Sequence, residues 1–312
     1  MSEKEKGKFA LIRKMGPLLG LLLLGVVLAL LSDRFFTVNN LLNVTRQISI
    51  NAIISVGMTL VILTGGIDLS VGSIVALAGS ITAGLLVGGQ GIWMAILAGL
   101  AVGIGLGLCN GLLVTKAGIP PFIATLGIMT AARGVTLVYT EGRPITGLGN
   151  DFRFLGGGYI SGIPVPVIIM AVIFIVMYIL LKKTRLGRYI YAIGGNEEAA
   201  RLSGISTKKI VLSVYAIGGL LAGFSGIIMA SRLNSAQPTA GVSFELDAIA
   251  AVVLGGTSLS GGVGTIGGTL VGAFIIGILD NGLNLLNVSS FYQQVAKGFV
   301  ILLAVFLDKK RG

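Results

Sequence analysis

The sequence predicts an all-α polytopic membrane protein with about ten transmembrane helices. Apolar residues make up 54% of the 312 residues, whereas charged residues make up only 11%. Soluble globular domains carry about 25% charged residues, so this composition excludes that class. Long uncharged stretches recur along the chain, and about 20 apolar residues are enough for one helix to cross a bilayer. A single membrane domain over residues 1–312 is the simplest division, because about ten spans leave little chain for a soluble domain.

Charged residues and helix breakers divide the apolar sequence into spans. The uncharged stretch 69–115 is too long for one helix and suits two, with a glycine-rich turn at 88–91. Pro120 and Pro121 mark the start of the next span, because proline is tolerated only in the first turn of a helix. A broken or re-entrant helix is expected near the glycine cluster 255–268. The predicted spans cover residues 16–32, 47–67, the two halves of 69–115, 122–139, 154–181, 210–231, a short 247–260, 262–286 and 291–307.

The basic residues indicate one orientation in the membrane. Sixteen of the 23 Lys and Arg residues lie in the N-terminal tail, at Lys116, within 182–209 and in the C-terminal KKR. If the N-terminus is cytosolic, the predicted spans place all four of these sites in the cytosol, as the positive-inside rule requires. Both termini are therefore expected in the cytosol. The net charge of +11 is then explained without a nucleic-acid partner.

The charged segment 182–209 contains the signals of a short helix of about two turns. Asn196 suits the N-cap, and the acidic pair 197–198 suits the positively polarised first turn. Arg201 suits the negative end of the helix, and Gly204 suits a left-handed residue that closes it. Two interpretations stay open. Either a cytosolic partner grips this helix, or the segment is a solvated loop whose charges only follow the positive-inside rule.

Glycine repeats predict how the spans pack. The chain has 49 glycines, and Gly99, Gly103, Gly107 and Gly111 recur at every fourth residue of one span. Such a stripe lets a second helix approach closely, so a structural role is expected for it. The nucleotide-binding sequence G-x-x-x-x-G-K-[ST] does not occur in the chain. Any use of ATP would therefore need another subunit.

Cysteine and histidine, which are common in metal sites and in the active sites of hydrolases, are scarce in this sequence. Cys109 is the only cysteine, and the chain has no histidine. An intrachain disulfide is excluded, and no bound metal or cofactor is expected. A membrane-embedded hydrolase is not expected either, because it would need a nucleophile with a neighbouring base.

Two copies of the motif G-G-x-x-L-S-x-G, which begin at Gly65 and Gly255, suggest an internal duplication. The first copy contains Asp68 and Ser70. An acid in or near the membrane is costly, so Asp68 is a candidate for the transport path. The alternative is a helix cap, because Asp68 directly precedes the third span and can accept hydrogen bonds from free amides there. Arg133 is the other costly charge, and it is expected to pair with an acid or to reach the membrane interface.

Several segments resemble the permease subunits of bacterial ABC sugar importers. They are GGIDLSVGSIVALAG, RYIYAIGGNEEAARLSGI, SAQPTAG followed by ELDAIAAVVLGGTSLSGG, and NGLNLLNVSSFYQQV. The resemblance runs from about Phe35 to Asp308 and is nearest to the ribose importers. It implies that the chain carries ribose or a related monosaccharide across the bacterial cytoplasmic (inner) membrane. It also implies a fold of about ten helices similar to that of the vitamin B12 importer permease.

The same resemblance implies the partners. They are a second permease copy in a homodimer, a cytosolic ATP-binding subunit that hydrolyses the ATP, and a periplasmic or lipid-anchored sugar-binding protein, with membrane lipid around the permease. The chain itself would then not be an enzyme, and 182–209 would be its cytosolic coupling loop. The residues that would dock the ATPase are Gly194, Gly195, Asn196, Glu197, Glu198, Ala199, Arg201, Leu202 and Gly204.

A tight sugar site is not expected within this chain. Sugar sites usually combine aromatic faces with paired polar groups, but Trp93 is the only tryptophan and polar residues inside the spans are sparse. Some Asn and Gln residues could line a polar path, although hydrogen bonds between helices are their more ordinary use. They are Asn51, Asn110, Asn281, Asn284, Gln293 and Gln294. The outer segments 141–162 and 232–247 are expected to meet the binding protein. The alternative function is an ion-coupled secondary transporter, for which Asp68 is the one plausible coupling site.

Overall fold

The structure is a computed structural model that describes residues 3–309, and these residues fold almost entirely into helices. The first five helices are α1 (Glu3–Leu31), α2 (Val38–Leu63), α3 (Val71–Val87), α4 (Ile92–Thr115) and α5 (Pro121–Thr140). The middle of the chain forms α6 (Asn150–Gly157), α7 (Val165–Lys183), α8 (Arg185–Gly195), α9 (Glu197–Leu202) and α10 (Thr207–Leu233). The last helices are α11 (Phe244–Leu254), α12 (Ile266–Leu285) and α13 (Ser290–Lys309).

Four very short strands lie at the connections between helices. They form two antiparallel pairs, β1 (Ile145–Thr146) with β4 (Ser235–Ala236) and β2 (Tyr159–Ile160) with β3 (Ile163–Pro164). The first pair joins two connections that are far apart in the sequence. It fixes the start of the segment that leads into α11.

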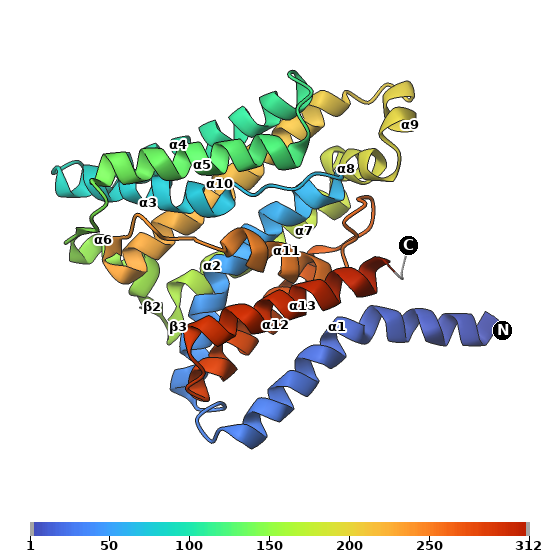
Figure 1. The fold of residues 1–312 in the computed structure, drawn as a ribbon, viewed down its shortest axis with the longest axis horizontal. Coiled ribbons are helices and arrows are strands. Elements are labelled where there is room, and N and C mark those ends of the chain that lie inside the picture. The colour runs from blue at the N-terminus through green and yellow to red at the C-terminus, as the bar shows by residue number, and fades with distance from the viewer. Residues whose placement is uncertain (1–2, 310–312) are drawn as a thin grey trace.

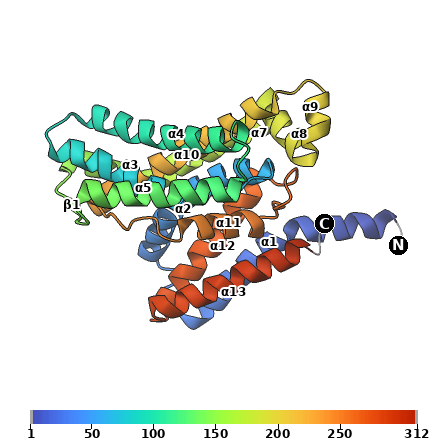
Figure 2. The same cartoon turned by 45° about the horizontal axis from the view of Figure 1, so that its top comes forward.

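Helices α2 and α10 form the centre of the bundle (Figure 1). Every residue of α2 from Ala52 to Leu63 is buried, and a helix that is apolar on all sides is expected to be surrounded by other helices. Helices α3 and α4 pack on α10, and α5 packs on α3. On the other side, α11 and α12 pack on α2, and α1 lies along α12 (Figure 2).

The outer helices expose large apolar side chains, which suits contact with lipid. Val138 of α5, Ile175 of α7 and Phe299 of α13 are all well exposed. Six of the described helices, α2, α4, α5, α7, α10 and α12, are long and apolar enough to cross a membrane. Two shorter apolar helices cover Gly16–Leu31 and Val71–Val87. The prediction of an all-α polytopic membrane protein is therefore confirmed, whereas the count of ten spans and the likeness to the vitamin B12 importer permease stay predictions.

Most of the predicted spans contain one helix, with some shifted ends. The turn at 88–91 separates α3 from α4, and α5 begins at Pro121, both as predicted. The predicted span 154–181 starts too early, because α6 and the β2–β3 hairpin occupy the chain up to Pro164. The predicted span 47–67 starts too late. Helix α2 already begins at Val38, where the Thr37 hydroxyl accepts a hydrogen bond from the Asn40 amide at 3.4 Å.

Two non-helical segments enter the interior and lead into short helices. Residues 64–70 connect α2 to α3, and residues 237–243 connect β4 to α11. The start of α3, directly after the first segment, meets the second segment where Gly72 lies against Gly241, so closely that a side chain on either glycine would overlap the carbonyl oxygen of the other. Non-helical backbone at membrane depth is tolerated where protein surrounds it. The expectation that 232–247 is an outer segment is therefore wrong for its second half, which folds back into the domain.

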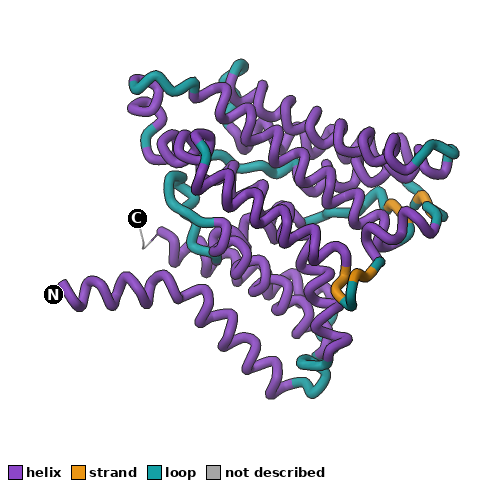
Figure 3. Tube along the Cα trace, turned by 180° about the vertical axis from the view of Figure 1, so that it is seen from behind, coloured by secondary structure: helices purple, strands orange, loops and turns teal. Residues whose placement is uncertain are grey.

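The connections lie at two opposite ends of the bundle. Helices α8 and α9 lie at the same end as the start of α1 and the end of α13 (Figure 1), and the view from behind shows the same arrangement (Figure 3). The turn between α3 and α4 and the segment around α6 lie at the other end. The orientation of these two ends in the membrane stays a prediction.

Candidate functional site

Helix α8 was not predicted, although it occupies the first half of the charged segment. Its N-cap is Thr184, whose hydroxyl accepts a hydrogen bond from the Gly187 amide at 3.3 Å. Gly187, Ile190 and Ile193 are buried on one face. This spacing of three residues is the sequence signal that could have revealed the helix. Tyr191 also donates a hydrogen bond to the Gly264 carbonyl at 2.8 Å, which ties α8 to the connection between α11 and α12.

Helix α9 has the predicted caps. The Asn196 side-chain oxygen accepts a hydrogen bond from the Ala199 amide at 2.9 Å, and Gly204 adopts a left-handed conformation with φ of +84°. Arg201 forms an ion pair with Glu198 at 2.6 Å. The pKa of Glu198 lies below its ordinary value because Arg201 donates hydrogen bonds to this carboxylate. The helix spans Glu197–Leu202, and these 6 residues make roughly the two turns expected.

The surface of α9 is available to a partner. Only Ala200 of this helix is buried, and the side chain of Leu202 is 77% exposed. An exposed leucine beside a charged pair is a pattern typical of docking surfaces. All the predicted docking residues from Asn196 to Gly204 are therefore exposed. The buried Ala200 was not one of them.

Gly194 and Gly195, the other two predicted docking residues, end α8 and differ from each other. Gly195 is exposed, and nothing lies within 4 Å of the position where its side chain would begin. Gly194 is packed so closely against Leu63 and Gly262 that a side chain would overlap their backbone atoms. Gly194 is therefore only partly exposed and contacts the end of α2 and the connection between α11 and α12, and its role in docking stays a prediction.

Asp68, Ser70 and Asn110 form a fully buried polar cluster. One oxygen of Asp68 accepts hydrogen bonds from the Ser70 amide at 2.8 Å and from the Ser70 hydroxyl at 2.6 Å. The Asn110 amide donates to the Ser70 hydroxyl at 2.7 Å. Asp68 thus holds the backbone just before α3, which is what the cap interpretation expects. Its second oxygen has no hydrogen-bond partner among the described residues, and a role in transport stays a prediction.

Arg133 makes contacts that differ from both expectations. Its guanidinium donates hydrogen bonds to the carbonyl oxygens of Pro238 at 2.7 Å and Ala240 at 2.8 Å, and it forms no ion pair among the described residues. These carbonyls belong to the non-helical segment before α11, where the backbone lacks the partners that a helix would supply. Arg133 on α5 therefore fixes the segment that crosses Gly72.

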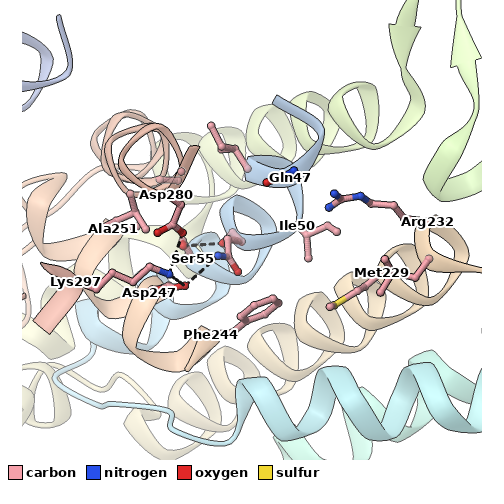
Figure 4. A pocket seen from close by; sticks show the side chains of 16 residues that line it. Gln47, Ile50, Ser55, Met229, Arg232, Phe244, Asp247, Ala251, Asp280 and Lys297 are labelled. Carbon is pink, nitrogen blue, oxygen red and sulfur yellow. Dashed lines mark hydrogen bonds and ion pairs between the residues drawn. The ribbon is translucent and has the colours of Figure 1, made fainter. Parts of the chain in front are cut away.

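A polar cavity of about 380 Å³ lies between α2, α10, α11, α12 and α13. Lys297 forms ion pairs with Asp247 at 3.0 Å and with Asp280 at 2.9 Å. The Asn51 amide lies 3.5 Å from the same oxygen of Asp247. Figure 4 shows this charged group at one end of the cavity and Arg232 at the other.

The sequence analysis missed most of this cavity. Asn51 was considered as a polar residue inside a span, but Asp247 was assigned to the end of an outer segment, and Asp280 and Lys297 were not considered. A signal was available, since Asp280 and Lys297 lie inside predicted spans, where ionisable residues are expensive and usually functional.

These features define a class of protein. A bundle of apolar helices with a charged cavity among them, non-helical connections in its interior and an exposed charged helix at one end is typical of membrane transport proteins. The family model described as the permease component of a branched-chain amino acid transport system matches residues 40–305. The chain belongs to this permease family, and it is a multi-pass protein of the inner membrane.

Several relatives match almost the whole chain. The ribose import permease of Bacillus subtilis (strain 168) is 56% identical over 303 residues, which cover 96% of this chain and 94% of the relative. The ribose import permease of Escherichia coli (strain K12) is 54% identical over 298 residues, or 94% and 93% of the two chains. The D-allose transport system permease of Escherichia coli (strain K12) is 42% identical over 311 residues, or 99% and 95%. No solved structure matches the chain.

These comparisons confirm the resemblance drawn from the sequence motifs. The relatives are named as permeases, which agrees with the prediction that the chain is not itself an enzyme. The family description names amino acids, whereas the relatives with more than half of their residues identical are named for ribose.

Proposed function

We propose that the chain is the permease subunit of an ABC importer that carries ribose or a related monosaccharide across the bacterial inner membrane. The observation that carries this proposal is the identity of 54% and 56% with two ribose import permeases over nearly their full lengths. The family description covers amino acid transport, but that match is to a whole family. Relatives that align over nearly their full length at high identity indicate the transported molecule better than the description of a whole family does.

A cytosolic ATPase subunit drives the permease and docks on α9. The exposed Leu202, the Glu198–Arg201 ion pair and the basic residues of the segment 182–209 support that assignment. Both termini lie on the same cytosolic side. A sugar-binding protein delivers the cargo to the opposite end, near α6 and the turn at 88–91. Two permease copies within the lipid bilayer form the pathway, since an importer of this kind has two nucleotide-binding sites to couple.

Closure of the ATPase is transmitted from α9 to the transmembrane helices. Helix α8 connects directly to α9, and Gly194 in α8 lies against the backbone of Leu63 and Gly262. Those two residues adjoin the non-helical connections that lead into α3 and α12. A rigid displacement of α8 and α9 therefore reaches both connections without passing through a flexible side chain. The helices rearrange around the pathway, and the cargo gains access to alternate sides of the membrane.

Reconstitution in proteoliposomes with the ATPase and the binding protein tests this function. We expect D-ribose uptake that requires ATP and both partner proteins and that persists when proton and sodium gradients are collapsed. Uptake by the chain alone, driven by an ion gradient, would contradict the proposal and support a secondary transporter. Uptake of a branched-chain amino acid, without uptake of any monosaccharide, would contradict the assignment of the cargo.

A further inference from the structure

The cavity between α2, α10, α11, α12 and α13 contains polar atoms that form no hydrogen bond to the surrounding helices. Lys297 neutralises one oxygen each of Asp247 and Asp280. The other oxygen of Asp280 and the side-chain oxygen of Asn51 are buried and have no hydrogen-bond partner among the described residues. Buried acceptors in native proteins are nearly always satisfied, so these two indicate a water molecule or a ligand beside them.

A purely structural role for the three charged residues does not explain the space beside them. Ion pairs that only hold helices together are favoured by close packing, because their attraction must offset the loss of hydration. Here the charges line a cavity of about 380 Å³, within the range of about 300–1,000 Å³ that small-molecule sites occupy. The cavity lies between five helices, including α11, which follows an interrupted backbone.

The lining of the cavity suits a neutral molecule with many hydroxyl groups. The lining contains two carboxylates and two cations, so its net charge is zero and it favours neither anionic nor cationic ligands. These residues are Asp247, Asp280, Lys297 and Arg232. Acceptors and donors lie within one cavity, and a hydroxyl group can bond to both. The ring of Phe244 also lines the cavity and offers an apolar face (Figure 4).

We propose that this cavity is a transit site that binds a monosaccharide on its way through the permease, an inference that rests on the proposed function. Sugar hydroxyls donate hydrogen bonds to the unused oxygens of Asp280 and Asn51. Lys297 donates to a sugar oxygen, and Phe244 contacts the C–H face of the ring. Binding is weak, because Lys297 is already held by two carboxylates and the only aromatic side chain of the lining is a phenylalanine. A weak site agrees with the expectation that the chain holds no tight sugar site, and it allows the sugar to leave.

The test uses the complete importer, with permease, ATPase and binding protein in proteoliposomes, and measures D-ribose taken up per ATP hydrolysed. The variants are Asp280→Asn, which keeps the size of the side chain, and Asn51→Ala. The matched control is Asn40→Ala, which removes an amide from the same helix α2. Asn40 exchanges hydrogen bonds with Asn281 of α12 at 3.0 and 2.9 Å but does not line the cavity.

We expect both cavity variants to lower the uptake of D-ribose per ATP by about fivefold or more, as the loss of one hydrogen bond to the sugar would. The control is expected to stay within about twofold of the unsubstituted importer, a smaller effect than that loss. Unchanged uptake per ATP in Asp280→Asn and Asn51→Ala would overturn the transit site, and so would an equal fall in the control. A second measurement covers variants that assemble poorly: saturation-transfer NMR of D-ribose on the permease in lipid nanodiscs. There we expect a signal that Asp280→Asn diminishes, and an undiminished signal would also overturn the site. If the unsubstituted importer carries no sugar at all, the proposed function fails, which is a different outcome.

Discussion

Gly194 at the end of α8 lies directly against Gly262, in the connection between α11 and α12, with no side chain between the two backbones. The Gly262 amide donates a hydrogen bond to the Leu63 carbonyl at 3.0 Å, and Gly194 covers this bond. A side chain on the neighbouring Gly261 would begin 3.1 Å from both the Gly194 carbonyl oxygen and the Gly65 amide. The two copies of the G-G-x-x-L-S-x-G motif therefore meet at the last turn of α8.

Gly194→Ala is expected to destabilise the permease by about 2 kcal/mol or more. The added methyl group would overlap the Leu63 carbonyl oxygen and the Gly262 nitrogen, and overpacking of a tight contact costs about 1–3 kcal/mol, with about 1 kcal/mol more for the lost hydrogen bond. The thermal unfolding midpoint of the purified permease checks this. Gly195→Ala is the matched control, because nothing lies within 4 Å of its side-chain position. Similar midpoints for the two variants would show that α8 can move away from Gly262 without loss.

Gly103→Ala is expected to separate α4 from α10. The stripe of Gly99, Gly103, Gly107 and Gly111 is buried, as the sequence analysis expected, and a methyl group on Gly103 would overlap the Gly219 carbonyl of α10. We expect a loss of about 1–3 kcal/mol in the free energy of unfolding. Gly105→Ala, one half turn away on the exposed face, has open space and is expected to change stability little. Denaturation followed by size-exclusion chromatography compares them, and an equally damaging Gly105→Ala would contradict the packing argument.

Short sequence patterns predicted the helices well, but they did not predict contacts between residues that are distant in the sequence. The Asn196 cap, the left-handed Gly204 and the start of α5 at Pro121 each depend on a few neighbouring residues. The meeting of Asp247 with Lys297 depends instead on how α11 and α13 pack, and no local rule gives that packing.

The same limit explains the error at the segment before α11. Its length and polar residues indicated an outer segment, because the sequence does not show that Arg133 of α5 donates hydrogen bonds to its carbonyls. Amphipathic α8 was missed for a different reason, since its three buried residues were present in the sequence but were read as part of a charged loop.

Asp68→Asn tests whether the buried acid acts as a cap or as an ion-coupling site. Asparagine keeps an oxygen that can accept the hydrogen bond from the Ser70 amide, so we expect ATP-driven D-ribose uptake to persist and stability to fall by about 1 kcal/mol, the difference between a charged and a neutral acceptor. Asp68→Ala leaves that amide and the Ser70 hydroxyl short of a partner and is expected to cost more, about 1–3 kcal/mol. Uptake assays with both variants separate the roles. Complete loss of uptake in a well-folded Asp68→Asn permease would favour coupling to an ion.

Reversal of the charge at Glu197 and Glu198, as Glu197→Lys with Glu198→Lys, is expected to weaken the docking of the ATPase. Both side chains are exposed in the first turn of α9, and the double change breaks the ion pair with Arg201 and places positive charge at the positively polarised end of the helix. We expect the affinity for the ATPase to fall at least tenfold, or about 1.4 kcal/mol, while the thermal unfolding midpoint of the permease changes little, because α9 buries only Ala200.

Asp151→Lys provides the matched control for this reversal. It also inverts an acid in the first turn of a short helix, α6, but at the opposite end of the bundle. Titration of the purified ATPase against permease in nanodiscs measures the two affinities. The swapped variant Glu198→Arg with Arg201→Glu separates two causes, because it restores the ion pair with its direction reversed. Recovery of docking in the swap would assign the effect to the stability of α9, whereas continued weakness would assign it to the charges that the ATPase contacts. Equal affinity of the ATPase for the unsubstituted and the charge-reversed permease would contradict docking on α9.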